Sequence, residues 1–125
     1  MGFLAWVVSF LLSLFFVPIG MIYGFIKCFN GHSLKQAFKT LDNKFFRMAV
    51  SKDQYGNVVC EELFNSTLRK KESKHSFGDE DETISSVIGK NLRDDTLSIA
   101  GKVLNKILCF FQKDHALKAI EDLND

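Results

Sequence analysis

Residues 3–26, FLAWVVSFLLSLFFVPIGMIYGFI, form a run of 24 residues without a charged side chain. As an α-helix, this run would be about 36 Å long, which is enough to cross a hydrocarbon core of roughly 30 Å. Trp6 and Tyr23 lie near its ends, where membrane interfaces favour aromatic side chains. The run therefore predicts a transmembrane anchor over residues 1–27, and we expect the lipid bilayer to be one partner of the protein.

Two other interpretations of this run stay open. Pro18 should kink a helix near Val17, and a full break from Pro18 to Gly20 would give a re-entrant hairpin or an interfacial insertion. A cleaved signal peptide normally has a basic start, an apolar core of about 7–15 residues and a small-residue cleavage site. No Lys or Arg precedes the run, and no such site follows it. A single span agrees best with these features.

The charges on either side of the run predict its orientation. No basic residue precedes it, whereas five expected membrane-surface residues follow it: Lys27, Lys35, Lys39, Lys44 and Arg47. Basic residues are retained on the cytoplasmic side, so the N-terminus should lie outside and the C-terminal domain in the cytoplasm. The widely spaced Cys28, Cys60 and Cys109 agree with a reducing compartment, because they form no disulfide pattern.

Residues 28–50 are predicted to form a basic amphipathic helix next to the membrane. Ser33 can cap this helix. Its apolar residues recur every three or four positions: Leu34, Ala37, Phe38, Leu41, Phe45, Met48 and Ala49. The helix could lie along anionic headgroups, or its apolar face could pack on the domain that follows, and both can hold for one helix.

Residues 51–125 are predicted to form a small helical domain. The stretch SKDQYGN, residues 51–57, should end the preceding helix, because Gly56 and Asn57 suit a turn. A helix is expected in 58–71, and another after the acidic residues 79–82, with Gly89 as its C-terminal cap.

The clearest helix of this domain is expected over 97–111. Its predicted stripe consists of Leu97, Ala100, Leu104, Ile107, Leu108 and Phe111. Asp114 could cap a last helix in which Leu117, Ile120 and Leu123 face inward. No useful strand pattern is present, so the predicted fold class is all-α: an N-terminal transmembrane helix followed by a small helical cytoplasmic domain.

The four consecutive acids at 79–82 are the chain's most conspicuous polar cluster. In a calcium loop that starts with Asp79 and Asp81, the next ligand position holds Thr83 in place of an acid, and the closing acid at position 90 is replaced by Lys90. No Cys or His spacing suits zinc, so we expect neither a metal nor a cofactor. The second acid pair suits the positive end of a helix dipole, and we expect Asp81 to cap that helix.

No spacing typical of catalysis is present, and we expect no catalytic residue. A small hydrolase or nucleotide-binding module that uses Asp81, Glu82, Ser85 and His115 stays an alternative. The formal net charge of +1 argues against a nucleic-acid partner.

Several motifs after residue 45 resemble a family of small proteins encoded by tailed bacteriophages and prophages. The shared pattern is D-Q-x-G-N, then D-E-T-[IL]-S-S, then a His before a short helix, and it covers roughly residues 45–122. Many relatives carry Cys where this chain has Ala116, which weakens any reactive His-Cys pair. The resemblance implies a phage origin and a bacterial inner membrane, but no activity. It indicates these candidate binding residues: Asp53, Asn57, Asp81, Glu82, Ser85 and His115.

These observations lead to one functional hypothesis and two further alternatives. The hypothesis is a membrane-anchored, non-enzymatic phage protein whose cytoplasmic domain binds a host or phage protein. One alternative is a lysis or membrane-permeabilising factor, for which Ser9 and Ser13 would allow a homo-oligomer through the transmembrane segment. The other is a virion protein that acts at the host membrane during genome entry.

Overall fold

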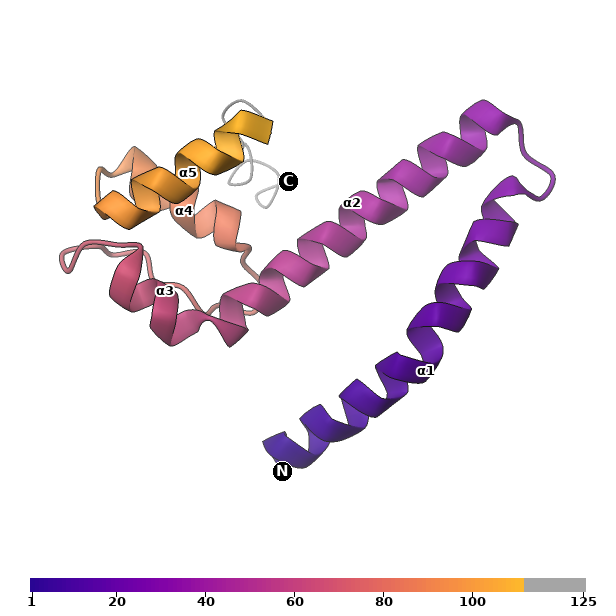
Figure 1. Ribbon diagram of the computed structural model, residues 1–125, viewed down its shortest axis with the longest axis horizontal. Coiled ribbons are helices and arrows are strands. Elements are labelled where there is room, and N and C mark those ends of the chain that lie inside the picture. The colour runs from indigo at the N-terminus through magenta and orange to yellow at the C-terminus, as the bar shows by residue number, and fades with distance from the viewer. Residues whose placement is uncertain (112–125) are drawn as a thin grey trace. The chain divides into compact units, whose positions relative to one another are not determined.

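The computed structural model describes residues 1–111, and these residues contain five helices and no strand (Figure 1). The helices are α1 (Gly2–Phe29), α2 (Leu34–Val59), α3 (Glu61–Thr67), α4 (Ile84–Arg93) and α5 (Ile99–Phe111). The all-α prediction is confirmed for this part of the chain. The last helix predicted after Asp114 lies outside the described residues, as does His115.

The chain divides into two compact units, Met1–Phe46 and Arg47–Asp125, and α2 contributes residues to both. In the first unit, α1 continues through Pro18 as one helix of 28 residues. Figure 1 shows α1 bending partway along its length, which is the effect expected of an internal proline. The structure therefore has one long helix here and not a hairpin.

No residue of α1 is buried, and the helix is long and apolar enough to cross a membrane. The loop after it leads into α2, where Ser33 caps as predicted: its hydroxyl accepts a hydrogen bond from the Gln36 amide at 3.3 Å. The rings of Phe29 and Phe38 are in contact, with centroids 5.6 Å apart.

The prediction that residues 51–57 end the helix is wrong, because α2 continues to Val59. Gly56 is helical, and a side chain there would come within 3.2 Å of Ile84 Cδ1. Asn57 is fully buried and points at the loop that precedes α4. The two residues suit a turn in isolation, but here they allow close packing and supply hydrogen bonds to the rest of the domain.

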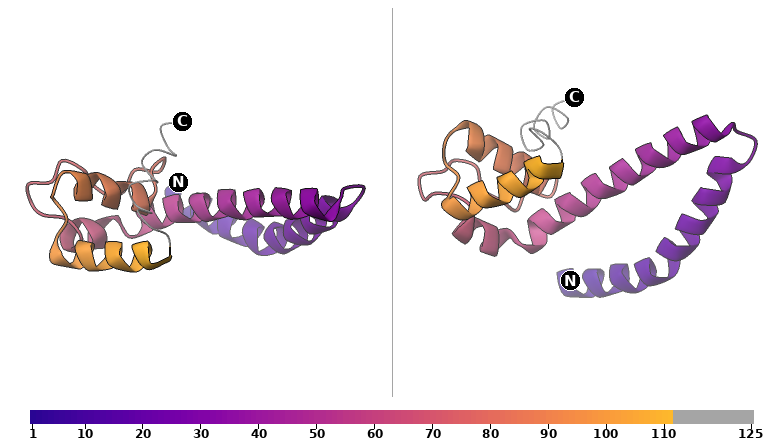
Figure 2. Two further views of the ribbon diagram at one scale, coloured as in Figure 1. Left: turned by 90° about the horizontal axis from the view of Figure 1, so that it is seen from above. Right: turned by 45° about the horizontal axis from the view of Figure 1, so that its top comes forward.

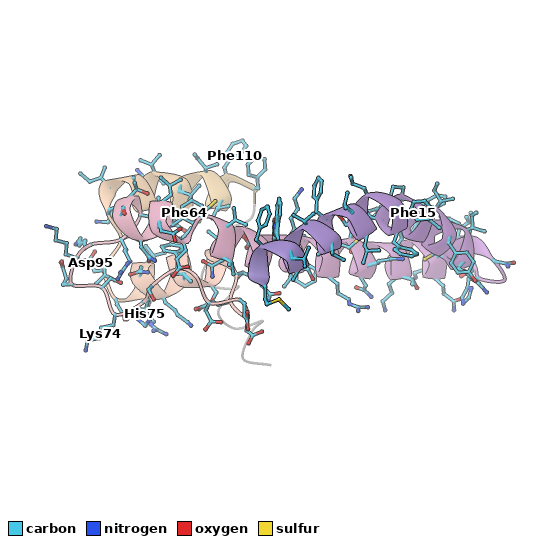
Figure 3. All side chains as sticks on the ribbon, turned by 90° about the horizontal axis from the view of Figure 1, so that it is seen from below. Phe15, Phe64, Lys74, His75, Asp95 and Phe110 are labelled. Carbon is cyan, nitrogen blue, oxygen red and sulfur yellow. The ribbon has the colours of Figure 1, made fainter. Side chains whose placement is uncertain are left out.

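In the second unit, α3, α4 and α5 gather around a small apolar core (Figure 2). The buried members of the core are Leu68, Phe77, Val87, Ile88 and Leu97. Phe64 of α3 packs edge-on against Phe77, with ring centroids 5.4 Å apart, and Figure 3 shows Phe64 between the helices. Residues 68–83 form the long loop that carries Phe77 into this core.

The end of α4 differs from the prediction, because Gly89 is buried within the helix and does not cap it. The helix ends at Arg93, Asp94 is its C-terminal cap, and Asp95 adopts a positive φ of 54°. The Thr96 amide donates to the Asn91 carbonyl at 2.8 Å, and the Asp95 amide donates to the Leu92 carbonyl at 3.2 Å. These two bonds form a Schellman motif, in which glycine is the usual residue at the position that Asp95 occupies.

The predicted helix at 97–111 is present as α5, but its inward face is narrower than predicted. Leu97, Leu104 and Leu108 pack on the core. Ala100, Ile107 and Phe111 are exposed. Gly101 is buried against the end of α3, where a side chain would overlap the Leu68 carbonyl oxygen. This close approach of the backbones sets which face of α5 turns inward.

Candidate functional site

Five of the six candidate residues come together around the start of α4. Asp53 and Asn57 belong to α2, Asp81 and Glu82 belong to the loop, and Ser85 lies in the first turn of α4. The sixth, His115, lies outside the described residues. The end of α2 is thus joined to a segment about 25 residues further along the chain, by the contacts described below.

Asn57 is the central residue of this cluster. Its Nδ2 donates to the carbonyl oxygens of Asp79 at 3.0 Å and Glu82 at 2.8 Å. Its Oδ1 accepts from the Gly78 amide at 3.1 Å. Both donor hydrogens of the amide are therefore used, and three backbone groups of the loop depend on one side chain. Asn57 thus fixes the path of the loop.

Three of the four acids at 79–82 have different structural roles, and the fourth, Glu80, is exposed. Asp79 Oδ1 accepts a hydrogen bond from the Asp81 amide at 2.9 Å, which forms a local turn. Asp81 contributes its backbone carbonyl, which accepts from Gln54 Nε2 at 3.0 Å. Glu82 accepts from the Ser86 hydroxyl at 2.8 Å and forms an ion pair with Lys90. Asp79, Asp81 and Glu82 are therefore built into the loop and the first two turns of α4.

The prediction that Asp81 caps α4 is wrong, because Thr83 is the capping residue. Its hydroxyl oxygen accepts from the Ser86 amide at 3.1 Å, and its backbone is extended, as an N-cap requires. Asp81 lies two residues too early, in the turn that Asp79 forms. It is Glu82 that reaches Lys90, along one side of the helix.

Asp53 supplies the negative charge expected at the start of α4, but from α2. Its Oδ2 accepts from the Ser85 amide at 3.4 Å, and the Ser85 side chain is buried. A carboxylate at this position favours the exposed amides and the dipole of the helix start. The five described candidates thus form a joint that connects α2 to α4.

Two further asparagines, which the sequence did not indicate, hold the same loop. Asn65 of α3 makes a reciprocal pair with Phe77, donating to its carbonyl at 3.0 Å and accepting from its amide at 2.8 Å. Asn91 of α4 donates to the His75 carbonyl at 3.1 Å and accepts from the Ser73 hydroxyl. A sequence signal does exist: asparagine is a poor helix former, so its place inside the two short helices α3 and α4 needs a reason.

At the opposite end of α4, His75 and Asp94 form a second polar pair that the sequence did not indicate. His75 Nε2 lies 2.6 Å from Asp94 Oδ2, and Arg93 Nε lies 3.2 Å from Asp94 Oδ1. Figure 3 shows His75 on the loop, next to Lys74. The hydrogen bond to His75, followed by that to Arg93, holds the pKa of Asp94 below its ordinary value. This pair ties the loop to the end of the helix.

Residues 1–111 contain no group of three His, Cys, Asp or Glu side chains that could hold a metal ion. Cys28, Cys60 and Cys109 are free thiols. Every described candidate residue takes part in a contact that positions the loop or α4. These contacts give the candidate residues a structural role in the domain.

No protein-family model matches the chain, and no curated protein and no solved structure matches it. The resemblance to phage proteins therefore stays a prediction.

Proposed function

We propose that this protein is a single-span membrane protein of phage or prophage origin whose helical C-terminal domain is a non-enzymatic binding module. The observation that carries the proposal is α1, which combines 28 residues with no buried side chain and no charge before Lys27. A helix of this length is about 42 Å long, which exceeds the roughly 30 Å of a bilayer core.

The exposed side chains of α1 support a lipid environment. Leu11, Leu12 and Val17 are all more than half exposed, and their positions in the sequence place them on different sides of the helix. Each such side chain gains about 1.5–3 kcal/mol on leaving water, and the described part of the protein covers none of them. A bilayer would cover all of them at once.

The first part of α2 supports a location at the cytoplasmic surface of the bacterial inner membrane. Leu34, Phe38 and Phe45 of its apolar face are exposed, which favours the headgroup alternative for this face. The cationic side chains Lys35, Lys39, Lys44 and Arg47 belong to the same helix. Such a helix can lie in the interface, with each basic residue contributing about 1 kcal/mol on an anionic surface.

The domain after residue 46 is proposed to bind a host or phage protein. Its candidate residues are occupied by contacts that hold the loop, which favours a rigid recognition surface over a reactive centre. In this proposal, the loop at 68–83 is fixed by Asn57, Asn65 and Asn91 in order to present a defined surface.

Extraction of membranes with alkaline carbonate tests the anchoring part of this proposal. The full-length chain, expressed in a bacterial host, should stay in the membrane pellet while peripheral proteins enter the supernatant. Release of the chain together with the peripheral proteins would refute a span.

A second candidate function, membrane permeabilisation, is favoured by one feature of α1. The Ser13 hydroxyl donates to the Phe10 carbonyl of its own helix at 2.7 Å. This hydroxyl therefore needs no hydrogen-bond partner from another helix, and Ser9 and Ser13 form a face of small residues. Such a face suits close helix approach. Expression of the full chain should then collapse the membrane potential, and an unchanged potential would eliminate this candidate.

A further inference from the structure

A stripe of exposed apolar side chains runs along α5 on the side away from the core. Ile99 and Phe110 are each 85% exposed, and Val103 and Ile107 are 54% and 51% exposed. Their spacing of four, four and three residues places them within an arc of about 80° on the helix. Figure 3 shows Phe110 projecting outward from the end of α5.

This stripe is separate from the face that holds the domain together. Gly101, Leu104 and Leu108 face inward, about 60° or more around the helix from the stripe. A surface helix of a soluble domain normally carries charged and polar residues on its outer side. Since α5 is apolar on both sides, its outer side needs an apolar partner of its own.

The charges of α5 identify the kind of partner. The helix contains no acidic residue, and its charged residues are Lys102 and Lys106, which are both exposed. The two lysines lie one turn apart, along one flank of the stripe. An apolar stripe with an aromatic residue and a basic flank is the pattern of a helix that lies in a membrane interface.

We infer that α5 binds the surface of an anionic phospholipid bilayer through Ile99, Val103, Ile107 and Phe110, with Lys102 and Lys106 at the headgroups. This inference rests on the proposed function, because α1 would keep the domain within reach of the bilayer. A tethered contact of this kind needs little affinity of its own, since the tether supplies a high effective concentration. The domain would then lie on the membrane through α5.

Lipid quenching of a fluorescent probe tests this contact in the full-length chain. Cys28, Cys60 and Cys109 are replaced with serine, and single variants Val103→Cys, Glu80→Cys and Phe15→Cys are labelled with an environment-sensitive dye. The chains are reconstituted in vesicles of equal parts phosphatidylglycerol and phosphatidylethanolamine that contain a nitroxide-labelled lipid. Val103 and Glu80 are both exposed, so neither label should disturb the core.

We expect the probe at position 103 to be quenched severalfold more than the probe at position 80. This quenching should fall severalfold in phosphatidylcholine vesicles, and also in the Lys102→Gln/Lys106→Gln variant, because both remove the electrostatic attraction. An unquenched probe at position 103 together with a quenched probe at position 15 would overturn the contact and leave the anchor intact.

Two further outcomes separate the remaining explanations. No quenching at position 15 would refute the anchor itself, and the contact with it. A blue-shifted probe at position 103 that lipid does not quench would mean that protein covers the stripe, either a second copy or the C-terminal segment, and would also overturn the contact.

Discussion

The helices α1 and α4 reach stability in opposite ways. α1 has 28 residues, nearly all apolar, and buries none of them. α4 has ten residues and buries six of them, of which only Val87 and Ile88 are large apolar residues. The helix with the greater hydrophobicity is thus the one without a protein core around it.

This difference shows that composition alone does not decide which residues a protein buries in its own core. α1 is apolar on every side, so no single neighbour could cover it, whereas a bilayer can. α4 is positioned by polar contacts at both ends, from Asp53 and Asn57 near its start to His75 near its end. Substitutions in the two regions should therefore act through different mechanisms.

The largest expected effect comes from placing charge within α1. The double substitution Leu12→Arg/Phe15→Arg should cost about 6 kcal/mol of insertion free energy, because each arginine near the centre of a span costs about 2.5–3.5 kcal/mol. The variant should lose its retention in carbonate-washed membranes. The control Leu12→Ala/Phe15→Ala should be retained, and equal retention of both variants would contradict a lipid environment for α1.

A substitution of Asn57 should have the next largest effect. Asn57→Ala would leave the Gly78 amide and two loop carbonyls without their partner, so we expect the free energy of unfolding to fall by about 3 kcal/mol. Urea unfolding in detergent, followed by circular dichroism, measures the change. Asn43→Ala on the exposed side of α2 is the matched control and should change stability by less than about 0.5 kcal/mol. Equal effects would mean that Asn57 does not hold the loop.

Replacement of a glycine by alanine should affect stability differently in the helical domain and in α1. Gly101→Ala should destabilise the domain by about 2 kcal/mol, because the new methyl group would overlap the Leu68 carbonyl oxygen and lie 2.8 Å from Leu97 Cδ2. Gly20→Ala in α1 meets nothing within 4 Å and should be neutral or stabilising. Thermal unfolding of the two variants measures both effects, and a neutral Gly101→Ala would contradict the close approach of α5.

A smaller and opposite effect is expected at the end of α4. Asp95 has a positive φ, which costs a residue with a side chain about 1 kcal/mol, so Asp95→Gly should stabilise the domain by about that amount. Asp95→Ala keeps the unfavourable conformation and should give no gain. A stability of Asp95→Gly at or below that of the alanine variant would show that the φ of Asp95 is not a source of strain.

The smallest expected effect is on the stability of the domain at low pH. The contacts of Asp94 lower its pKa in the folded chain below the ordinary value of 3.8. As the pH falls, the unfolded chain therefore takes up a proton at this carboxylate before the folded chain does. The stability that the ionised Asp94 contributes is lost as the pH falls below 3.8 through the lowered pKa. Stability measured from about pH 5 to about pH 2 should therefore decline less steeply in Asp94→Asn than in the original chain. The substitution Asp42→Asn, at an exposed position of α2, should leave the decline unchanged.

The sequence was sufficient where a property depends on neighbouring residues. The uncharged run of α1, the Ser33 cap and the helix α5 follow from local patterns, and all three are present. The helix end expected at Gly56 and Asn57 failed because the same two residues suit a turn or a packed helix, and only contacts with the distant Ile84 and Glu82 decide between them.

The candidate site shows the same limit. The acidic run correctly indicated the start of α4, but it did not distinguish Asp81 from Thr83 as the cap, since both residue types cap helices well. The partners of Asn65 and Asn91 were missed because they include backbone groups of a loop 12 or 16 residues away. An asparagine inside a helical segment indicates that its side chain has a partner, but it does not indicate which backbone group that partner is.

Labelling of two cysteines from the two sides of the membrane tests the central claim most directly. In a chain with Cys28, Cys60 and Cys109 replaced by serine, Gly2→Cys and Glu80→Cys are treated separately with a membrane-impermeant maleimide on intact bacterial spheroplasts. We predict that the cysteine at position 2 is labelled at once, whereas the cysteine at position 80 is labelled only after the membrane is permeabilised. Labelling of both from the same side would contradict a single span through α1.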